Sequence, residues 1–125
     1  MRWMWIDKVI AFEPEKRLVA VKNVSLAEEH LHQHFAAEGG LPAAPVMPNS
    51  LILEGMAQTA GILVGSVHGF REKVVLAKVA SATFERDVTP GETIRYDATI
   101  ERMDAMVAST IGIVERWSFG DTAWA

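Results

Sequence analysis

The chain contains no cysteine, so disulfide bonds, zinc–thiolate sites and thiol nucleophiles are excluded within it. It also lacks a large excess of charge of one sign, because its formal net charge is −4 at pH 7. This balance disfavours a domain-wide basic surface, and we expect no nucleic-acid partner. The absence of disulfides is typical of a reducing compartment, so we expect a cytoplasmic location.

Long, uninterrupted apolar runs are also missing. The apolar N-terminal run is broken by Asp7 and Lys8, unlike the core of a signal peptide. The longest apolar stretch, Leu51–Val67, contains Glu54 and Gln58. It is also at the short end of the ~17–25 residues that a membrane span needs. Because a charge inside a bilayer is costly, we expect a helix buried within the protein and no membrane span.

Hydrophobic residues are abundant in the chain, where they fill 50% of the 125 positions. That share is enough to form a core and argues against disorder. The length favours a single domain over residues 1–125.

Hydrophobic alternation predicts strands before and after one central helix. The first two strands are expected at residues 3–11 and 17–24, joined as a hairpin by a turn at Pro14. Later strands are expected at residues 73–84, 92–103 and 106–118, with a short last strand after Gly120-Asp121. Strands segregated from one long helix indicate an α+β fold with the helix on one face of an antiparallel sheet.

The central helix is expected to begin near Asn49 or Ser50, because both residues are favourable N-caps. It is expected to end at His68, with Gly69 as the C′ residue. Small and apolar residues lie nearly all round this helix, so we expect it to be buried. A long loop rich in glycine and proline precedes it, and loops of that length usually have a function.

Glu54 is placed one turn into this apolar helix. A carboxylate there can act as a catalytic acid or base, or it can simply stabilise the helix dipole. Gln58 lies four residues later on the same helix face, where it could orient Glu54 or be satisfied by neighbouring backbone. The first N–H groups of the helix, around Pro48, Asn49 and Ser50, have no intrahelical partner and could stabilise an oxyanion.

His34 lies on the loop before the helix, and alone it is more typical of a structural or exposed histidine. His30, His32 and His34 alternate, so on an extended backbone the three would share one face. A zinc site with an open position is therefore one alternative. The other pairs His34 with Glu54 for proton abstraction next to a carbonyl.

Several stretches, in order along nearly the whole chain, resemble one family. They are Gln33-His34-Phe35, Pro45-Val46-Met47-Pro48, Leu51-Ile52-Leu53-Glu54-Gly55-Met56-Ala57-Gln58, and Phe84 followed by Val88-Thr89-Pro90-Gly91-Glu92. Together they resemble the 3-hydroxyacyl-[acyl carrier protein] dehydratases of the FabZ type. The combination is specific, although each motif alone would be weak.

The resemblance implies a hot-dog fold, with a sheet wrapped around one long helix, and it implies no cofactor and no metal. It implies a homodimer, which often assembles further into a hexamer, with His34 of one subunit and Glu54 of the other in each site. Substrate-binding residues are then expected among Phe35, Pro48, Asn49, Ser50 and Gln58. The substrate would be a thioester of acyl carrier protein or of coenzyme A.

In the implied reaction, His34 removes the proton next to the thioester carbonyl, and Glu54 protonates the departing 3-hydroxyl. Backbone N–H groups at the helix start hold the enolate oxygen. The sequence departs from the family pattern at Asn49-Ser50, which replace Gly-Val, and in an insertion within Ala36–Ala44. An acyl thioesterase on the same fold and a non-catalytic acyl-binding subunit are therefore the alternatives.

Overall fold

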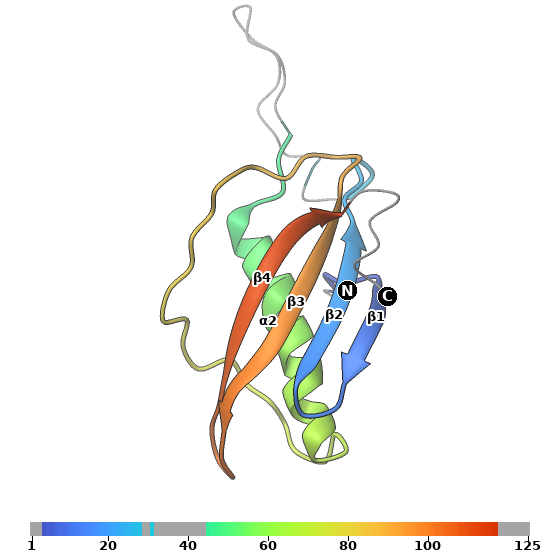
Figure 1. Ribbon diagram of the computed structural model, residues 1–125. Coiled ribbons are helices and arrows are strands. Elements are labelled where there is room, and N and C mark those ends of the chain that lie inside the picture. Colours follow the sequence, from blue (N-terminus) through green and yellow to red (C-terminus); the bar gives the residue numbers. More distant parts are fainter. Residues whose placement is uncertain (1–3, 29–30, 32–44, 118–125) are drawn as a thin grey trace, which may run out of the picture.

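The computed structural model describes residues 4–28, 31 and 45–117. In this part the strands are β1 (Lys8–Glu13), β2 (Arg17–Asn23), β3 (Thr93–Met103) and β4 (Ala108–Trp117). They form one antiparallel sheet in the order β1-β2-β3-β4. Helix α2 (Asn49–Val67) follows β2 in the chain and crosses one face of the sheet (Figure 1). The predicted α+β architecture is confirmed.

The N-terminal hairpin is confirmed, but its first strand starts later than predicted. The turn at Pro14 closes through a hydrogen bond from the Lys16 N–H to the Glu13 carbonyl, 3.0 Å long. Between residues 4 and 7 the chain is irregular, because the Trp5 N–H donates to a side chain of α2 and not to a neighbouring strand. β1 therefore begins at Lys8.

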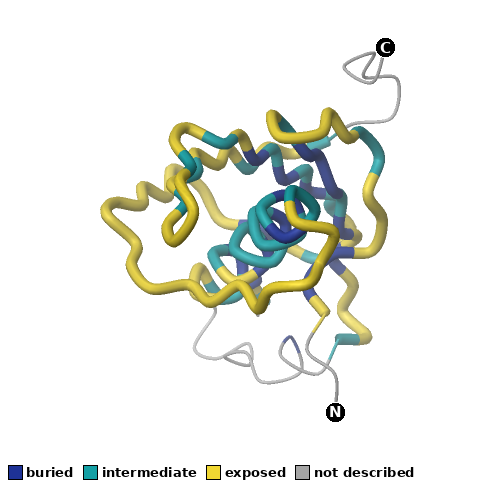
Figure 2. Tube along the Cα trace, turned by 90° about the horizontal axis from the view of Figure 1, so that it is seen from below, coloured by how far each residue is buried: buried dark blue, intermediate teal, exposed yellow. Residues whose placement is uncertain are grey.

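The predicted strand at residues 73–84 is absent from the described part of the chain. Residues 71–87 form an exposed, irregular segment. It runs from the end of α2 round the helix toward the start of β3 (Figures 1 and 2). A strand needs a backbone partner as well as an alternating pattern, and β4 has no second neighbour among the described residues. The predicted strand after Gly120-Asp121 lies outside the described residues.

The core lies between α2 and the inner face of the sheet. From the sheet, Leu18, Ala20, Ile94, Tyr96 and Ala98 are buried. From the helix, Ile52 and Leu63 pack against them. The helix lies closest to β3 and also contacts β2 and β4, so the sheet holds it along its length.

α2 has the predicted extent, with a different N-terminal cap. The N-cap is Pro48, in an extended conformation, and no side chain caps the helix. Its carbonyl accepts the Leu51 and Ile52 N–H groups at 3.0 and 3.2 Å, so Asn49 is already helical and does not act as the cap. At the other end His68 is the C-cap, and Gly69, with φ +64°, is the expected C′ residue.

By length and apolar composition alone, α2 could cross a membrane. One such helix is weak evidence for a membrane span, because the core helix of a soluble protein passes the same test. Five residues of α2 are buried within this chain: Ile52, Gly55, Thr59, Leu63 and Gly65. Ile52, Gly55 and Leu63 face the core and the sheet, and Glu54 and Gln58 interrupt the opposite side. These features are those of the core helix of a folded domain.

Candidate active site

Ser50, Glu54 and Gln58 form a row on one side of α2. They are spaced four residues apart, so their side chains lie one above another on the helix surface. Ser50 and Glu54 are exposed in this chain, and Gln58 is half-buried. Glu54 lies beyond the first helical turn, which contains no acidic residue, so stabilising the free N–H groups of the helix start does not explain it.

The start of α2 is fixed in position by the core. Met47 is buried, and its N–H donates to the Val88 carbonyl at 2.7 Å. The N–H groups of Asn49 and Ser50 come before the first intrahelical hydrogen bond, so α2 itself offers them no acceptor. Both residues are exposed. A rigid pair of backbone donors therefore lies one turn before Glu54, where it can receive a substrate oxygen.

Gln58 connects Glu54 to the N-terminal segment of the chain. Its Nε2 donates to Glu54 Oε1 at 3.3 Å, and its Oε1 accepts the Trp5 backbone N–H at 2.8 Å. The predicted contact between Gln58 and Glu54 is therefore present. The Trp5 contact was not predicted, because a backbone donor leaves no mark in the side-chain pattern.

The residue after Glu54 allows α2 to approach the sheet closely. Gly55 is buried, and a Cβ at this position would overlap the ring and hydroxyl of Tyr96 on β3. Tyr96 is fully buried. Burial raises the pKa of its hydroxyl far above the ordinary value, and the charges of Asp7 and Glu28 add to the effect. The Tyr96 hydroxyl is therefore kept neutral, and its ring packs against α2 at Gly55.

Two predicted site residues, His34 and Phe35, lie outside the described residues, as do His30 and His32. Their distances to Glu54 are therefore not part of the described geometry, and the roles of His34 and Phe35 stay predictions. Within the described ranges no group of three potential metal-ligating side chains comes together. The three-histidine zinc site stays a hypothesis as well.

A family comparison covers almost the whole chain, since the model of the FabA-like domain matches residues 2–124. The chain belongs to the FabA-like family. The arrangement of one long helix on an antiparallel sheet is that of the hot-dog fold expected for this family, so the predicted fold class is confirmed.

Curated relatives of the FabA-like chain are named 3-hydroxyacyl-[acyl-carrier-protein] dehydratase FabZ. The relative from Rickettsia bellii is 34% identical over 122 residues, which are 96% of this chain and 74% of the relative. The relative from Alkalilimnicola ehrlichii is 38% identical over 102 residues, or 78% and 62% of the two chains. That from Solibacter usitatus is 36% identical over 115 residues, or 89% and 65%. The FabZ-type resemblance is confirmed, and the chain spans about two thirds to three quarters of these relatives.

Proposed function

We propose that this FabA-like chain is a dehydratase that converts a 3-hydroxyacyl thioester to the trans-2-enoyl thioester, in fatty-acid or related lipid biosynthesis. The observation that carries the proposal is Glu54, held by Gln58 one turn beyond two free backbone donors at the start of α2. Relatives named as FabZ dehydratases support the same reaction.

The chemistry needs one base, one acid and one oxyanion site. His34 takes the proton from the carbon next to the thioester carbonyl, and the electron pair moves into the enolate. As the enolate collapses to the carbon–carbon double bond, the C3–O bond breaks and Glu54 gives its proton to the leaving hydroxyl, which departs as water. Proton transfer from His34 to Glu54 through solvent then resets the site.

The donors at the helix start stabilise the enolate oxygen. The N–H groups of Asn49 and Ser50 point out of the positive end of the helix dipole, which favours negative charge. Pro48 and the buried Met47 fix this turn in place, so the donors need no rearrangement during the reaction. Phe35 is proposed to contact the substrate beside His34.

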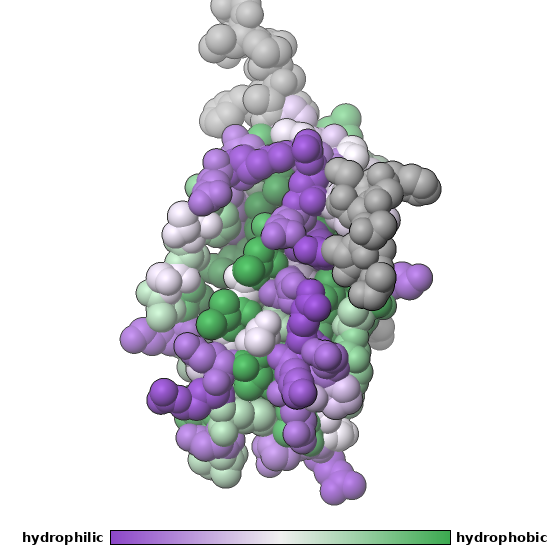
Figure 3. All heavy atoms as spheres, in the orientation of Figure 1, coloured by the Kyte–Doolittle hydropathy of each residue, from purple (hydrophilic) through white to green (hydrophobic). Residues whose placement is uncertain are grey.

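A homodimer, with His34 and Glu54 of different subunits in each site, is part of the proposal. The segment 71–87 exposes five large hydrophobic side chains: Val74, Val75, Leu76, Val79 and Phe84. Val75 is 70% exposed. The space-filling view shows hydrophobic residues open to solvent between polar ones on the outer face of the sheet (Figure 3). A second copy of the chain would cover such surfaces, and trimers of dimers would give a hexamer.

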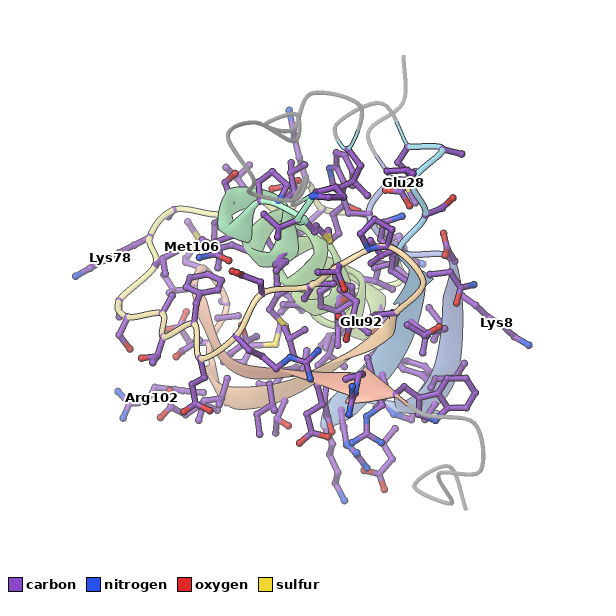
Figure 4. All side chains as sticks on the ribbon, turned by 90° about the horizontal axis from the view of Figure 1, so that it is seen from above. Lys8, Glu28, Lys78, Glu92, Arg102 and Met106 are labelled. Carbon is purple, nitrogen blue, oxygen red and sulfur yellow. The ribbon has the colours of Figure 1, made fainter. Side chains whose placement is uncertain are left out.

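We propose acyl carrier protein as the carrier, with coenzyme A as the alternative. Acyl carrier proteins are acidic, and Arg71, Lys73 and Lys78 lie exposed on the segment after α2. Lys78 points away from the body of the molecule (Figure 4). Arg86 is less available, because it pairs with Glu92. The location in the cell is proposed to be the cytoplasm.

The test of the reaction is to identify the product. The purified protein is incubated with a 3-hydroxyacyl thioester on acyl carrier protein and on coenzyme A, and the acyl species are followed by mass spectrometry. Loss of one water with the thioester intact is the expected result. Free acid would instead indicate the thioesterase, and an unchanged, tightly bound thioester would indicate the non-catalytic acyl-binding subunit.

A complementation experiment tests whether the site is shared between subunits. His34→Ala and Glu54→Gln proteins, each inactive alone, are mixed and allowed to exchange subunits. In a two-fold dimer each mixed pair has one site with both residues intact, so about a quarter of the wild-type activity should return. No recovery after proven subunit exchange would mean that His34 and Glu54 act within one chain.

A further inference from the structure

The side-chain amide of Gln58 can take only one orientation. Its Oε1 lies 2.8 Å from the Trp5 backbone nitrogen. An N–H group can only donate, so the atom facing it must be the carbonyl oxygen of the amide. The NH₂ group is then directed at Glu54, where Nε2 lies 3.3 Å from Oε1.

The donor that sets this orientation is itself anchored. Trp5 and Ile6 are buried in the core, with exposed fractions of 7% and 8%. The next residue, Asp7, is tied to β2 twice, since its N–H donates to the Val21 carbonyl at 2.8 Å and its Oδ2 accepts the Asn23 N–H at 2.7 Å. The ammonium group of Lys22 also lies 5.9 Å from the centre of the Trp5 ring. The Trp5 N–H is therefore fixed relative to the sheet.

The two oxygens of Glu54 are unequal as a result. Oε1 accepts a hydrogen bond from Gln58, so a proton on Oε1 would meet the hydrogens of the Gln58 NH₂ group. Oε2 has no hydrogen-bond partner among the described residues, and Glu54 is exposed in this chain. A proton on the carboxyl group is thus favoured on Oε2, the oxygen that is open to a substrate.

We propose that Gln58 is a positioning residue that, oriented by the Trp5 backbone N–H, keeps the reactive proton of Glu54 on Oε2. This inference rests on the proposed dehydratase function and assigns Gln58 an action on Glu54, not on the substrate. It makes the anchored segment Trp5–Asp7 a part of the catalytic apparatus through one main-chain donor. Proton transfer to the leaving hydroxyl then always starts from the same oxygen.

The kinetic test compares Gln58→Met, which keeps the side-chain length and removes the hydrogen bonds to Glu54 and to the Trp5 N–H, with wild type. A hydrogen bond to a charged group stabilises by about 1.5–3 kcal/mol, so kcat should fall roughly 10- to 100-fold while KM changes little. Ser66→Ala is the matched control. It removes a polar side chain of the same helix about 18 Å from Glu54, and it should keep the wild-type kcat.

Gln58→Glu separates positioning from packing. The Trp5 N–H favours a charged carboxylate at position 58, and two adjacent carboxylates do not both ionise readily. Glu54 should therefore keep its proton to higher pH, and the alkaline limb of the pH–rate profile for dehydration should move upward. A purely structural role would leave the shape of that profile unchanged. Wild-type kcat, KM and pH profile in both Gln58 variants would overturn the proposal.

A spectroscopic readout keeps this inference separate from the proposed function. If the wild type shows no turnover, the dehydratase proposal fails, and amide resonances can still be followed against pH. The proposal predicts that the Gln58 side-chain NH₂ and the Trp5 backbone N–H shift together as Glu54 ionises, and that both shifts vanish in Glu54→Gln. Resonances that do not respond to Glu54 in the wild type would overturn it.

Discussion

Replacing Gly55 by alanine should destabilise the protein, although alanine favours helices. Because Gly55 lies inside α2, the intrinsic preference for alanine is worth about 1 kcal/mol. Against this gain, the new Cβ would overlap Tyr96, which is fully buried and cannot move aside freely. Overpacking of this kind costs about 1–3 kcal/mol, so we expect a net loss of up to about 2 kcal/mol.

Gly61 provides the matched control on the same helix. A Cβ added there would meet no atom of the described residues within 4 Å, so Gly61→Ala should stabilise by about 0.5–1 kcal/mol. The difference between the two variants isolates the contact of α2 with β3. For a chain of this length each kcal/mol corresponds to about 3–6 °C in Tm.

Thermal and urea unfolding of both variants, at one fixed protomer concentration, measures this difference. Fixing the concentration matters because an oligomer gains apparent stability from association. Gly55→Ala should unfold below wild type and Gly61→Ala above it. A Gly55→Ala protein as stable as Gly61→Ala would refute the close packing of α2 on Tyr96 of β3.

Two further predictions concern the proposed chemistry and the ion pair of Arg86 with Glu92, next to the start of β3. His34→Ala should lower the dehydration rate about 10²- to 10⁴-fold in a kinetic assay. The control His68→Ala, at the C-cap of α2, should keep the wild-type rate. Equal rates for His34→Ala and wild type would argue against His34 as the base. Partial burial opposes ionisation of Glu92, but hydrogen bonds from Thr89 and the charge of Arg86 lower its pKa below 4.5. Glu92→Gln should therefore be less stable than wild type near pH 7, and this gap in urea unfolding should close as the pH falls below about 4.5.

The sequence allowed the elements with strong local patterns to be predicted. α2 could be located because a long apolar run ends at Gly69, which takes the positive φ expected of a C′ residue. The hairpin around Pro14 and the strands β3 and β4 follow from alternation and turn residues. These features depend on near neighbours in the chain, so the sequence records them directly.

The predictions from the sequence were wrong where backbone groups distant in the chain determine the local structure. Residues 73–84 alternate like a strand, yet among the described residues no neighbour completes their hydrogen bonds. β1 starts late because the Trp5 N–H turns toward Gln58 on α2, 53 residues away. The cap at Pro48 was missed because Asn49 and Ser50 are better side-chain caps, whereas here the Pro48 carbonyl accepts the first helical hydrogen bonds.

For the candidate site, the sequence placed Glu54 and Gln58 on one helix face, and the structure shows them in contact. What the side-chain pattern could not predict is the orientation of Gln58, because a main-chain donor sets it. The partnership of His34 with Glu54 rests on the family resemblance and stays a prediction.

The central claim is that Glu54 serves as the acid in an acyl-thioester dehydratase. The most direct measurement is the reverse reaction, hydration of a short trans-2-enoyl thioester, followed by the loss of its conjugated absorbance. Wild type should turn over, Glu13→Gln on β1 should match it, and Glu54→Gln should be slower by about 10²–10⁴-fold. Equal turnover by Glu54→Gln, or no turnover by folded wild type with either carrier, would contradict the account.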